Sequence, residues 1–166
     1  ALAHAPVDVL LLDRRNHHVF SPLLYQVATA GLSPGDIAAP IRWILRKQRN
    51  VKVWLAEATG VDSSRNVVTL ADGEVPYDYL IVAAGARPSY FGHDAWQAHA
   101  RGLKTMEDAI AIRQQILVAF ERAERERDPA IQKRLLTFVV VGGGATGVSL
   151  WIKLSGPLAL RALAQS

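Results

Sequence analysis

Apolar runs alternate with polar and glycine-rich stretches along the chain, and this pattern predicts a mixed α/β fold. Val7–Leu12 is a continuous apolar run ended by Asp13, which is typical of a buried parallel strand. Residues 14–36 are rich in His, Pro and Gly and have no sustained period, so they predict a long loop, usually a functional feature. Apolar positions on one face predict a helix over 39–47, and residues 51–61 are expected to form a strand.

The middle of the chain predicts a β-meander and then a long helix. Residues 65–85 contain two extended runs on either side of a turn at 71–74. Thr105 and Asp108 form a capping-box pattern, which marks the start of a helix. Apolar residues on one face continue this helix, and Asp128-Pro129 is expected to end it. The predicted buried face consists of Ala109, Ile112, Ile116, Phe120 and Ala123.

A glycine-rich turn follows an apolar strand predicted over 136–141. Residues 142–147, with the sequence GGGATG, satisfy the G-x-G-x-x-G fingerprint of a dinucleotide-binding turn between a strand and a helix. Gly142 permits a tight turn, Gly144 lets the backbone approach a pyrophosphate, and Gly147 lets the helix pack close to its strand. Free N–H groups at the start of that helix would face the phosphates. The pattern favours a dinucleotide site over a plain glycine turn.

The first predicted strand ends in the acidic residue that completes a fingerprint of this kind. Asp13 stands where the carboxylate of a Rossmann unit binds a pair of ribose hydroxyls, and the glycine loop of that unit is expected before Ala1. The acidic partner of the later glycine turn is expected beyond Ser166. Together the two motifs predict parts of two nucleotide-binding domains, the first without its glycine loop and the second without its end.

The amino-acid composition excludes only a few classes of protein and of functional site. Apolar residues make up 50% of the 166 positions and charged residues 20%, which is typical of a globular protein. No apolar run approaches the roughly 20 residues that span a bilayer. Cysteine is absent, which excludes disulfides, thiolate metal sites and redox-active cysteine pairs. The formal charge of +4 favours anionic partners only weakly.

Four longer stretches carry a family resemblance. "DRRNHHVFSPLLYQVATAGLSPGDIAAPIR", "YDYLIVAAGARPSYFG", "GLKTMEDA" and "FVVVGGGATGV" resemble, in the same order, the type II NADH dehydrogenases, which are non-proton-pumping NADH:quinone oxidoreductases. The resemblance covers Val7–Val148. It implies an incomplete Rossmann-like FAD-binding domain with a β-meander over 1–100, and the start of a second Rossmann-like NAD(P)H-binding domain over 101–166. FAD and NADH are the implied cofactors.

The resemblance also implies which residues contact the cofactors. Asp13 would bind the adenosine ribose of FAD, and Ala84 replaces the usual threonine of an Ala-Thr-Gly motif. No residue is assigned a catalytic role, and no metal site is expected. The implied FAD residues are Asp13, Arg14, Asn16, His17, Phe20, Ala58, Ala84 and Gly85. The implied NADH residues are Gly142, Gly144, Ala145 and Gly147.

In the intact family the implied reaction is hydride transfer from NADH to the flavin, followed by electron transfer to a quinone. The resemblance implies peripheral association with the cytoplasmic face of the inner membrane, leaves a homodimer open and implies no nucleic-acid partner. The sequence departs from the family after Val148. Ser149 stands where relatives have Glu, and Gly156-Pro157 is expected to break the helix. The 166 residues alone are expected to bind FAD weakly or not at all, because the first glycine loop supplies many pyrophosphate contacts.

Three alternatives remain open from the sequence. One is another NAD(P)H flavoprotein reductase of the same fold, such as a ferredoxin reductase. A second is a basic helix over 41–54 that binds an anionic membrane surface or a nucleic acid, although the strand-like "VKVW" favours an ordinary packed helix and strand. The third is a non-functional gene fragment whose ancestors were dehydrogenases.

Overall fold

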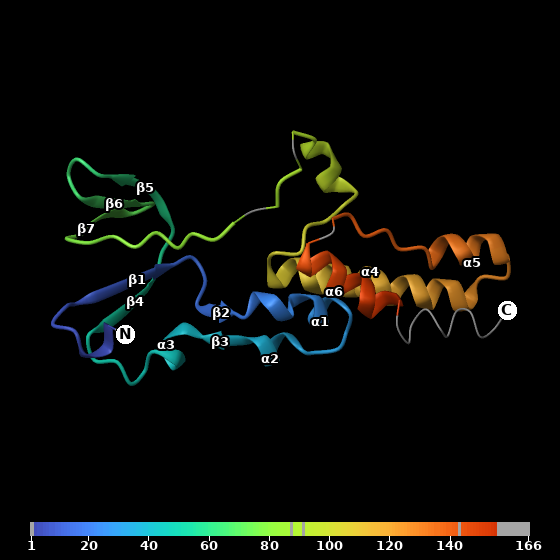
Figure 1. Ribbon diagram of the computed structural model, residues 1–166, viewed down its shortest axis with the longest axis horizontal. Helices are drawn as coiled ribbons and strands as arrows, with labels where there is room; N and C mark the ends of the chain where they lie inside the picture. The colour runs from blue at the N-terminus through green and yellow to red at the C-terminus, as the bar shows by residue number, and fades with distance from the viewer. Residues whose placement is uncertain (1, 87, 91, 143, 156–166) are drawn as a thin grey trace. The chain divides into compact units, whose positions relative to one another are not determined.

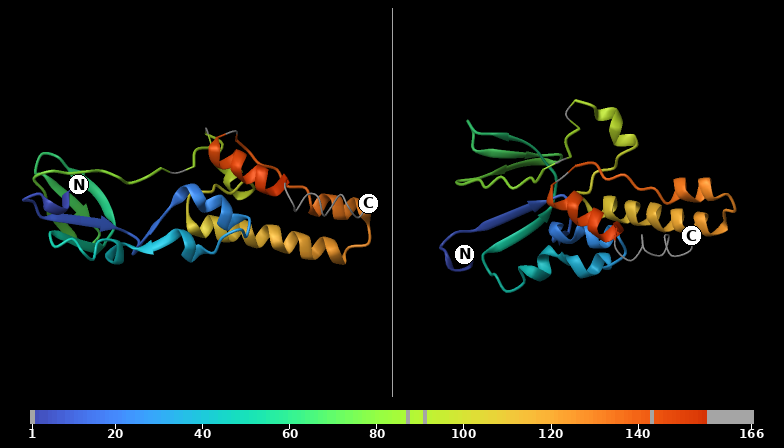
Figure 2. Two further views of the ribbon diagram at one scale, coloured as in Figure 1. Left: turned by 60° about the horizontal axis from the view of Figure 1, so that its bottom comes forward. Right: turned by 45° about the vertical axis from the view of Figure 1, so that its right-hand side comes forward.

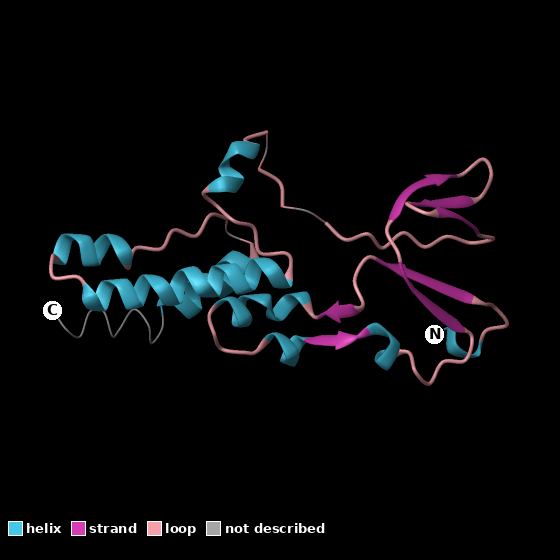
Figure 3. Ribbon diagram, turned by 180° about the vertical axis from the view of Figure 1, so that it is seen from behind, coloured by secondary structure: helices cyan, strands magenta, loops and turns pink. Residues whose placement is uncertain are grey.

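The chain folds into two compact units. The computed structural model describes residues 2–86, 88–90, 92–142 and 144–155. The first unit holds the described residues of 1–19 and 38–85, and the second those of 20–37 and 86–166. All strands of the described residues lie in the first unit, whereas the second is built from helices and their connections (Figures 1 and 3).

A parallel strand pair forms the centre of the first unit. Strand β1 (Val9–Asp13) pairs with β4 (Val51–Leu55), with Val9 opposite Val51 and Asp13 opposite Leu55. A 3-10 turn, η1 (Leu2–His4), precedes β1. The Asn50 side chain donates hydrogen bonds to the carbonyls of Leu2 and Val7, so it ties the approach to β1 against the approach to β4. The predicted parallel strand is confirmed, although its residues are half-buried rather than buried.

A three-stranded antiparallel sheet confirms the predicted meander. It consists of β5 (Ala58–Asp62), β6 (Val67–Leu70) and β7 (Gly73–Pro76) in sequential order. Val68 and Leu70 on β6 are buried, because this central strand has neighbours on both edges.

Two strand predictions from this region are wrong. The single strand expected over 51–61 is interrupted at residues 56–57, because β4 pairs in parallel with β1 whereas β5 pairs antiparallel with β6. The second extended run stops at Pro76, and residues 77–85 pair with no strand of the described chain.

The segment between the two parallel strands is more regular than predicted. Strand β2 (His17–Val19) pairs antiparallel with β3 (Ala38–Pro40). Because β3 takes up residues 38–40, the helix expected over 39–47 shortens to α3 (Ile41–Ile44). The loop expected over 14–36 also contains η2 (Ser21–Leu23), α1 (Leu24–Ala28) and α2 (Pro34–Ile37).

A long capped helix organises the second unit. Helix α4 (Met106–Arg125) begins with the predicted capping box: the Thr105 hydroxyl accepts from the Asp108 N–H at 3.1 Å, and the Asp108 carboxylate accepts from the Thr105 N–H at 3.0 Å. Helix α1 packs against α4, as both views of Figure 2 show. The buried residues of the second unit include Leu24, Val27, Ala28, Ile37, Met106, Ala109, Ile116 and Ala123.

The end of α4 differs from the prediction. The helix stops at Arg125, and Asp128 caps a further helix, α5 (Pro129–Leu135), by accepting from the Ala130 N–H at 2.8 Å. Gln132 donates to the carbonyls of Ala123 and Glu126 and so closes the corner between the two helices. A short 3-10 helix, η3 (Asp94–Ala98), precedes α4.

The strand expected over 136–141 does not form in the described chain. These residues follow α5 without pairing, because no strand among the described residues of this unit is there to complete a ladder. The side chain of Val139 is 82% exposed as a result. The helix predicted after the glycines is present as α6 (Ala145–Lys153), and the predicted break at Gly156-Pro157 lies outside the described residues.

An ion-pair network links the turn between β5 and β6 to strand β7. Arg65 donates to Asp62 at 2.7 Å and, through two nitrogens, to both oxygens of Glu74 at 2.7 and 3.0 Å. A hydrogen bond from the Ser64 hydroxyl, followed by those from Arg65, holds the pKa of Asp62 well below its ordinary value. The Arg65 bonds likewise hold the pKa of Glu74 below its ordinary value.

These lowered pKa values make the meander acid-sensitive. Both carboxyls have lower pKa values folded than unfolded, so their stabilisation is complete above about pH 5 and is lost as the pH falls through the folded values. In Arg65→Gln, NMR titration of the carboxyl carbons should move the Glu74 midpoint to its ordinary range. The Asp62 midpoint should stay low, because Ser64 still donates to it. Arg42→Gln, which removes an exposed arginine outside the network, should move neither, and an unmoved Glu74 midpoint in Arg65→Gln would contradict the assignment.

Candidate functional site

The glycine turn of the second unit adopts a conformation that requires glycine. Gly142 has a φ of +106°, in the region that residues with a side chain rarely adopt. Gly144 is the N-cap of α6, and its carbonyl accepts from the Val148 N–H at 3.0 Å. A Cβ added at Gly147 would overlap the carbonyl oxygen of Gly142. The close packing of the helix on its preceding segment, predicted for Gly147, is therefore present in the structure.

The start of α6 offers hydrogen-bond donors at this turn. The first N–H groups of a helix, here from Ala145 onward, have no partner within the helix, and the helix dipole places partial positive charge there. A hollow of about 150 Å³ lies beside the turn, lined by Val140, Gly142, Gly147, Val148 and Trp151. Pockets for small ligands enclose roughly 300–1,000 Å³. The turn and hollow therefore suit one wall of a dinucleotide site, with backbone N–H groups facing the phosphates.

Asp13 is held at the carboxyl end of the parallel strand pair. Its Oδ1 accepts from the Arg15 N–H at 2.8 Å, and its carbonyl accepts from the Ala56 N–H at 3.0 Å. The first bond fixes the carboxylate in a tight turn, and the second joins it to the chain that leaves β4. The carboxyl edge of parallel strands is where nucleotides bind in open α/β sheets. Asp13 therefore stands where a ribose-binding carboxylate is needed.

The neighbouring residues of the first unit lie along the same stretch. Arg14 is exposed, and Asn16 accepts from the Ile41 N–H through its carbonyl at 3.0 Å. The Asn16 side-chain oxygen lies 3.1 Å from Nδ1 of His17. Ala58 begins β5, two residues after the Ala56 N–H that bonds to Asp13. The structure thus brings Asp13, Arg14 and Ala58 to one end of the strand pair.

The other three implied FAD residues lie in other segments of the chain. Ala84 and Gly85 lie in an exposed stretch without regular structure, and Gly85 has a φ of +76°. Phe20 belongs to the second unit, where its N–H donates to the Ile37 carbonyl and its side chain is 54% exposed.

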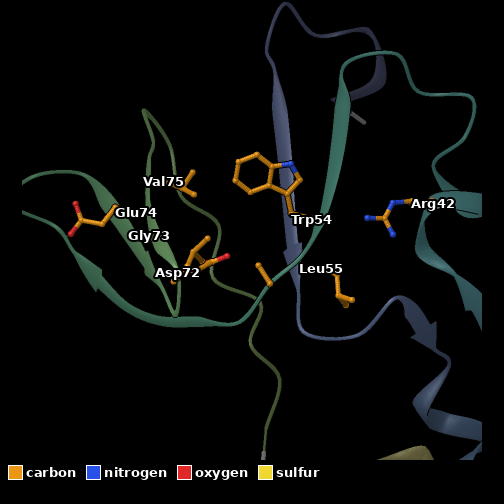
Figure 4. A pocket seen from close by; sticks show the side chains of 9 residues that line it. Arg42, Trp54, Leu55, Asp72, Gly73, Glu74 and Val75 are labelled. Atoms are coloured by element: carbon orange, nitrogen blue, oxygen red, sulfur yellow. The ribbon is translucent and has the colours of Figure 1, made fainter.

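An open cleft in the first unit contains residues that the sequence did not single out. Its volume is about 510 Å³ (Figure 4). The Trp54 side chain points from β4 toward the hairpin of β6 and β7, and Ala56 connects the cleft to Asp13. Alternation along β4 places Trp54 on the exposed face with Lys52, which is the signal that could have found it. The cleft is lined by Arg42, Trp54, Leu55, Ala56, Leu70, Asp72, Gly73, Glu74 and Val75.

Relatives of known function match most of the chain. It is 52% identical over 153 residues to the type II NADH:quinone oxidoreductase Ndh of Mycobacterium tuberculosis, covering 90% of this chain and 33% of that protein. It is 38% identical over 159 residues to the mitochondrial external alternative NADH-ubiquinone oxidoreductase of Yarrowia lipolytica, covering 89% of this chain and 27% of that protein. The chain spans about a third of the length of these curated relatives.

Solved structures confirm the α/β fold class and the resemblance to the type II NADH dehydrogenases. NDH2 from Plasmodium falciparum in complex with NADH matches with a TM-score of 0.82 at 28% identity, covering 95% of this chain and 34% of that one. The sulfide:quinone oxidoreductase of Aquifex aeolicus, at 23% identity and a TM-score of 0.61, shares the fold. Residues 1–156 match the pyridine nucleotide-disulphide oxidoreductase family model. The chain therefore belongs to the pyridine nucleotide-disulphide oxidoreductase family.

Proposed function

We propose that this chain contributes parts of the FAD and NADH sites of a non-proton-pumping NADH:quinone oxidoreductase. The observation that carries the proposal is the glycine turn before α6, where Gly147 lies too close to Gly142 to accept a side chain. The 52% identity to a type II NADH:quinone oxidoreductase supports the same function. Because the chain spans about a third of that relative, the activity is proposed for the whole enzyme.

The first unit fits the adenosine end of FAD. Asp13, fixed by Arg15, would accept hydrogen bonds from the two ribose hydroxyls, and exposed Arg14 lies next to it. Ala58 has the small side chain that lets a backbone approach an adenine ring, and Ala84 and Gly85 would let the chain pass close to the cofactor. The proposed FAD residues are Asp13, Arg14, Asn16, His17, Phe20, Ala58, Ala84 and Gly85.

The second unit fits the pyrophosphate of NADH. Gly144 and Ala145 would place the helix N-terminus of α6 against the phosphates, and Gly142 and Gly147 shape the turn that allows this approach. When bound, the flavin would take a hydride from NADH and pass electrons to the quinone. This chain would bind and orient the two cofactors. We propose no proton-transfer role for any of its side chains.

The acceptor and the location belong to the same proposal. A quinone dissolved in a bilayer requires an enzyme at the membrane surface, and we place the enzyme on the cytoplasmic face of the inner membrane, as a monomer or a homodimer. No helix among the described residues is both long and apolar enough to cross a bilayer.

A chimera tests the proposal. In it, residues 7–148 would replace the matching segment of the Mycobacterium tuberculosis relative, to which the chain is 52% identical. The purified chimera should retain FAD, oxidise NADH and reduce a soluble quinone within about tenfold of the relative, because both partial sites are completed. A folded chimera that retains flavin but reduces ferredoxin in preference to quinone would favour a ferredoxin-type reductase. A folded chimera without flavin would contradict the proposed FAD site.

A further inference from the structure

One wall of the open cleft in the first unit combines an indole with a carboxylate. The Trp54 side chain points from β4 toward the hairpin of β6 and β7, which carries Asp72 and Val75 (Figure 4). The indole of Trp54 is 47% exposed, so much of its ring surface is open to a ligand. We call this wall the indole subsite, and it consists of Trp54, Asp72 and Val75.

The carboxylate of Asp72 is free to meet a ligand. It lies in the turn between β6 and β7, and it forms no hydrogen bond or ion pair with the described residues. Glu74, which also lines the cleft, points away from Trp54 in Figure 4. Both oxygens of Glu74 accept from Arg65, at 2.7 and 3.0 Å, so its charge is already paired. A positive charge at the indole subsite would therefore be attracted mainly by Asp72.

The cationic side chain that lines the cleft stands apart from the indole subsite. Arg42 comes from α3 and lies on the other side of β4 from Trp54 in Figure 4. Its guanidinium donates to the Val53 carbonyl at 2.9 Å, and this bond holds the group against the strand. Lys52 shares a face of β4 with Trp54 but is not among the residues that line the cleft. The indole subsite therefore has a negative formal charge that no lining cation offsets.

We propose that the indole subsite binds a small organic cation with an alkylated or quaternary ammonium group. The face of an indole attracts such a cation, and Trp is the strongest of the aromatic side chains in this respect. Alkyl groups on the nitrogen would contact Val75, while Asp72 attracts the charge. A metal ion is disfavoured, because the described residues contain no group of three or more metal-ligating side chains. The cleft, at about 510 Å³, lies within the roughly 300–1,000 Å³ of small-ligand pockets.

NMR titration of the purified full chain with choline tests the proposal. The chain has four tryptophans, and the indole N–H signal of Trp54 is the one that disappears in Trp54→Phe. Choline should shift this signal to saturation. Its neutral isostere, in which carbon replaces the charged nitrogen, should bind at least about fivefold more weakly, because it lacks the charge that the ring and the carboxylate attract. The signal of Trp43, whose ring already has the Arg46 guanidinium 4.0 Å from its centre, should stay in place.

Substitutions separate the ring from the carboxylate, with binding followed through the backbone amide of Gly73, which lines the cleft. Trp54→Leu should weaken choline binding about fivefold, whereas Trp54→Phe should retain part of it, because a phenyl face also attracts a cation. Asp72→Asn should weaken binding about threefold. Asp78→Asn removes the same charge outside the cleft and should leave the affinity unchanged. Equal affinities for choline and its neutral isostere, or equal losses in the Asp72 and Asp78 variants, would overturn the proposal.

This site is separate from the proposed function. None of the residues proposed to bind FAD or NADH lines the cleft. In the chimera, Asp72→Asn should therefore retain flavin and reduce a soluble quinone normally. Loss of flavin from a folded Asp72→Asn chimera would show that the cleft belongs to the cofactor site, and it would overturn the assignment of a separate cation site. Failure of the wild-type chimera to retain flavin would instead contradict the proposed function alone.

Discussion

Replacing Gly147 by alanine is expected to weaken NADH binding severely. The new Cβ would overlap the carbonyl oxygen of Gly142 and approach the side chain of Val140, so α6 must move away from the turn. That movement displaces the helix N-terminus whose N–H groups would hold the pyrophosphate. In the chimera, calorimetry should show NADH affinity reduced at least about 100-fold, since two or more hydrogen bonds to charged oxygens are lost at about 1.5–3 kcal/mol each.

Gly144→Ala is the comparison variant, because its alanine should leave the fold of the turn intact. Gly144 has a φ of −73°, and an added Cβ would meet no atom within 4 Å, so the protein itself can accept alanine. Its unfolding free energy should fall by about 1 kcal/mol or less, through the weaker N-cap. NADH affinity should still fall, because the methyl group stands where the pyrophosphate approaches. Unchanged NADH binding in Gly147→Ala would show that the turn does not hold the nucleotide.

The glycine turn was predictable because its causes are local. The positive φ of Gly142 and the overlap at Gly147 arise between residues five positions apart, and glycine is the residue type that satisfies both. The capping box at Thr105 was predictable for the same reason, since its two hydrogen bonds join residues three positions apart. Where a short sequence contains every interacting group, its chemistry specifies the structure.

Elements that depend on distant partners were not predictable in this way. The apolar run 136–141 has the composition of a strand, yet a strand forms only where another chain segment accepts its hydrogen bonds. Helix α1 shows the opposite case. Its five residues are too few for a recognisable period, and packing against α4 buries Leu24 and Val27.

The candidate FAD site also has a part that local sequence predicts and a part that depends on distant segments. The apolar run that ends in a carboxylate indicated Asp13, but its restraint by Arg15 and its link to Ala56 depend on the turn and on the partner strand. The sequence did not predict Trp54 as a site residue. An exposed aromatic residue on an edge strand becomes a candidate only when the structure shows the cleft that it lines. A carboxylate held by its own turn is also the part of this site that single substitutions can test most directly.

Replacing Asp13 by alanine should strongly weaken FAD binding. The carboxylate would accept hydrogen bonds from both hydroxyls of the adenosine ribose, and each such bond to a charged group contributes about 1.5–3 kcal/mol. Loss of both predicts FAD affinity at least about 100-fold weaker in the chimera, measured by flavin retention and fluorescence titration. Asp13→Asn should lose about tenfold, because the amide retains one acceptor oxygen for Arg15 or for a ribose hydroxyl.

Asp8→Ala supplies the comparison at the other end of the same strand. Asp8 precedes β1 whereas Asp13 ends it, so the two carboxylates carry the same charge at opposite edges of the parallel pair. A general electrostatic effect would weaken flavin binding in both variants, but a ribose contact would weaken it only in the Asp13 variants. Because nucleotides bind at the carboxyl edge of parallel strands, the Asp8 variant should retain FAD. Equal flavin loss in both would assign the role to charge rather than to position.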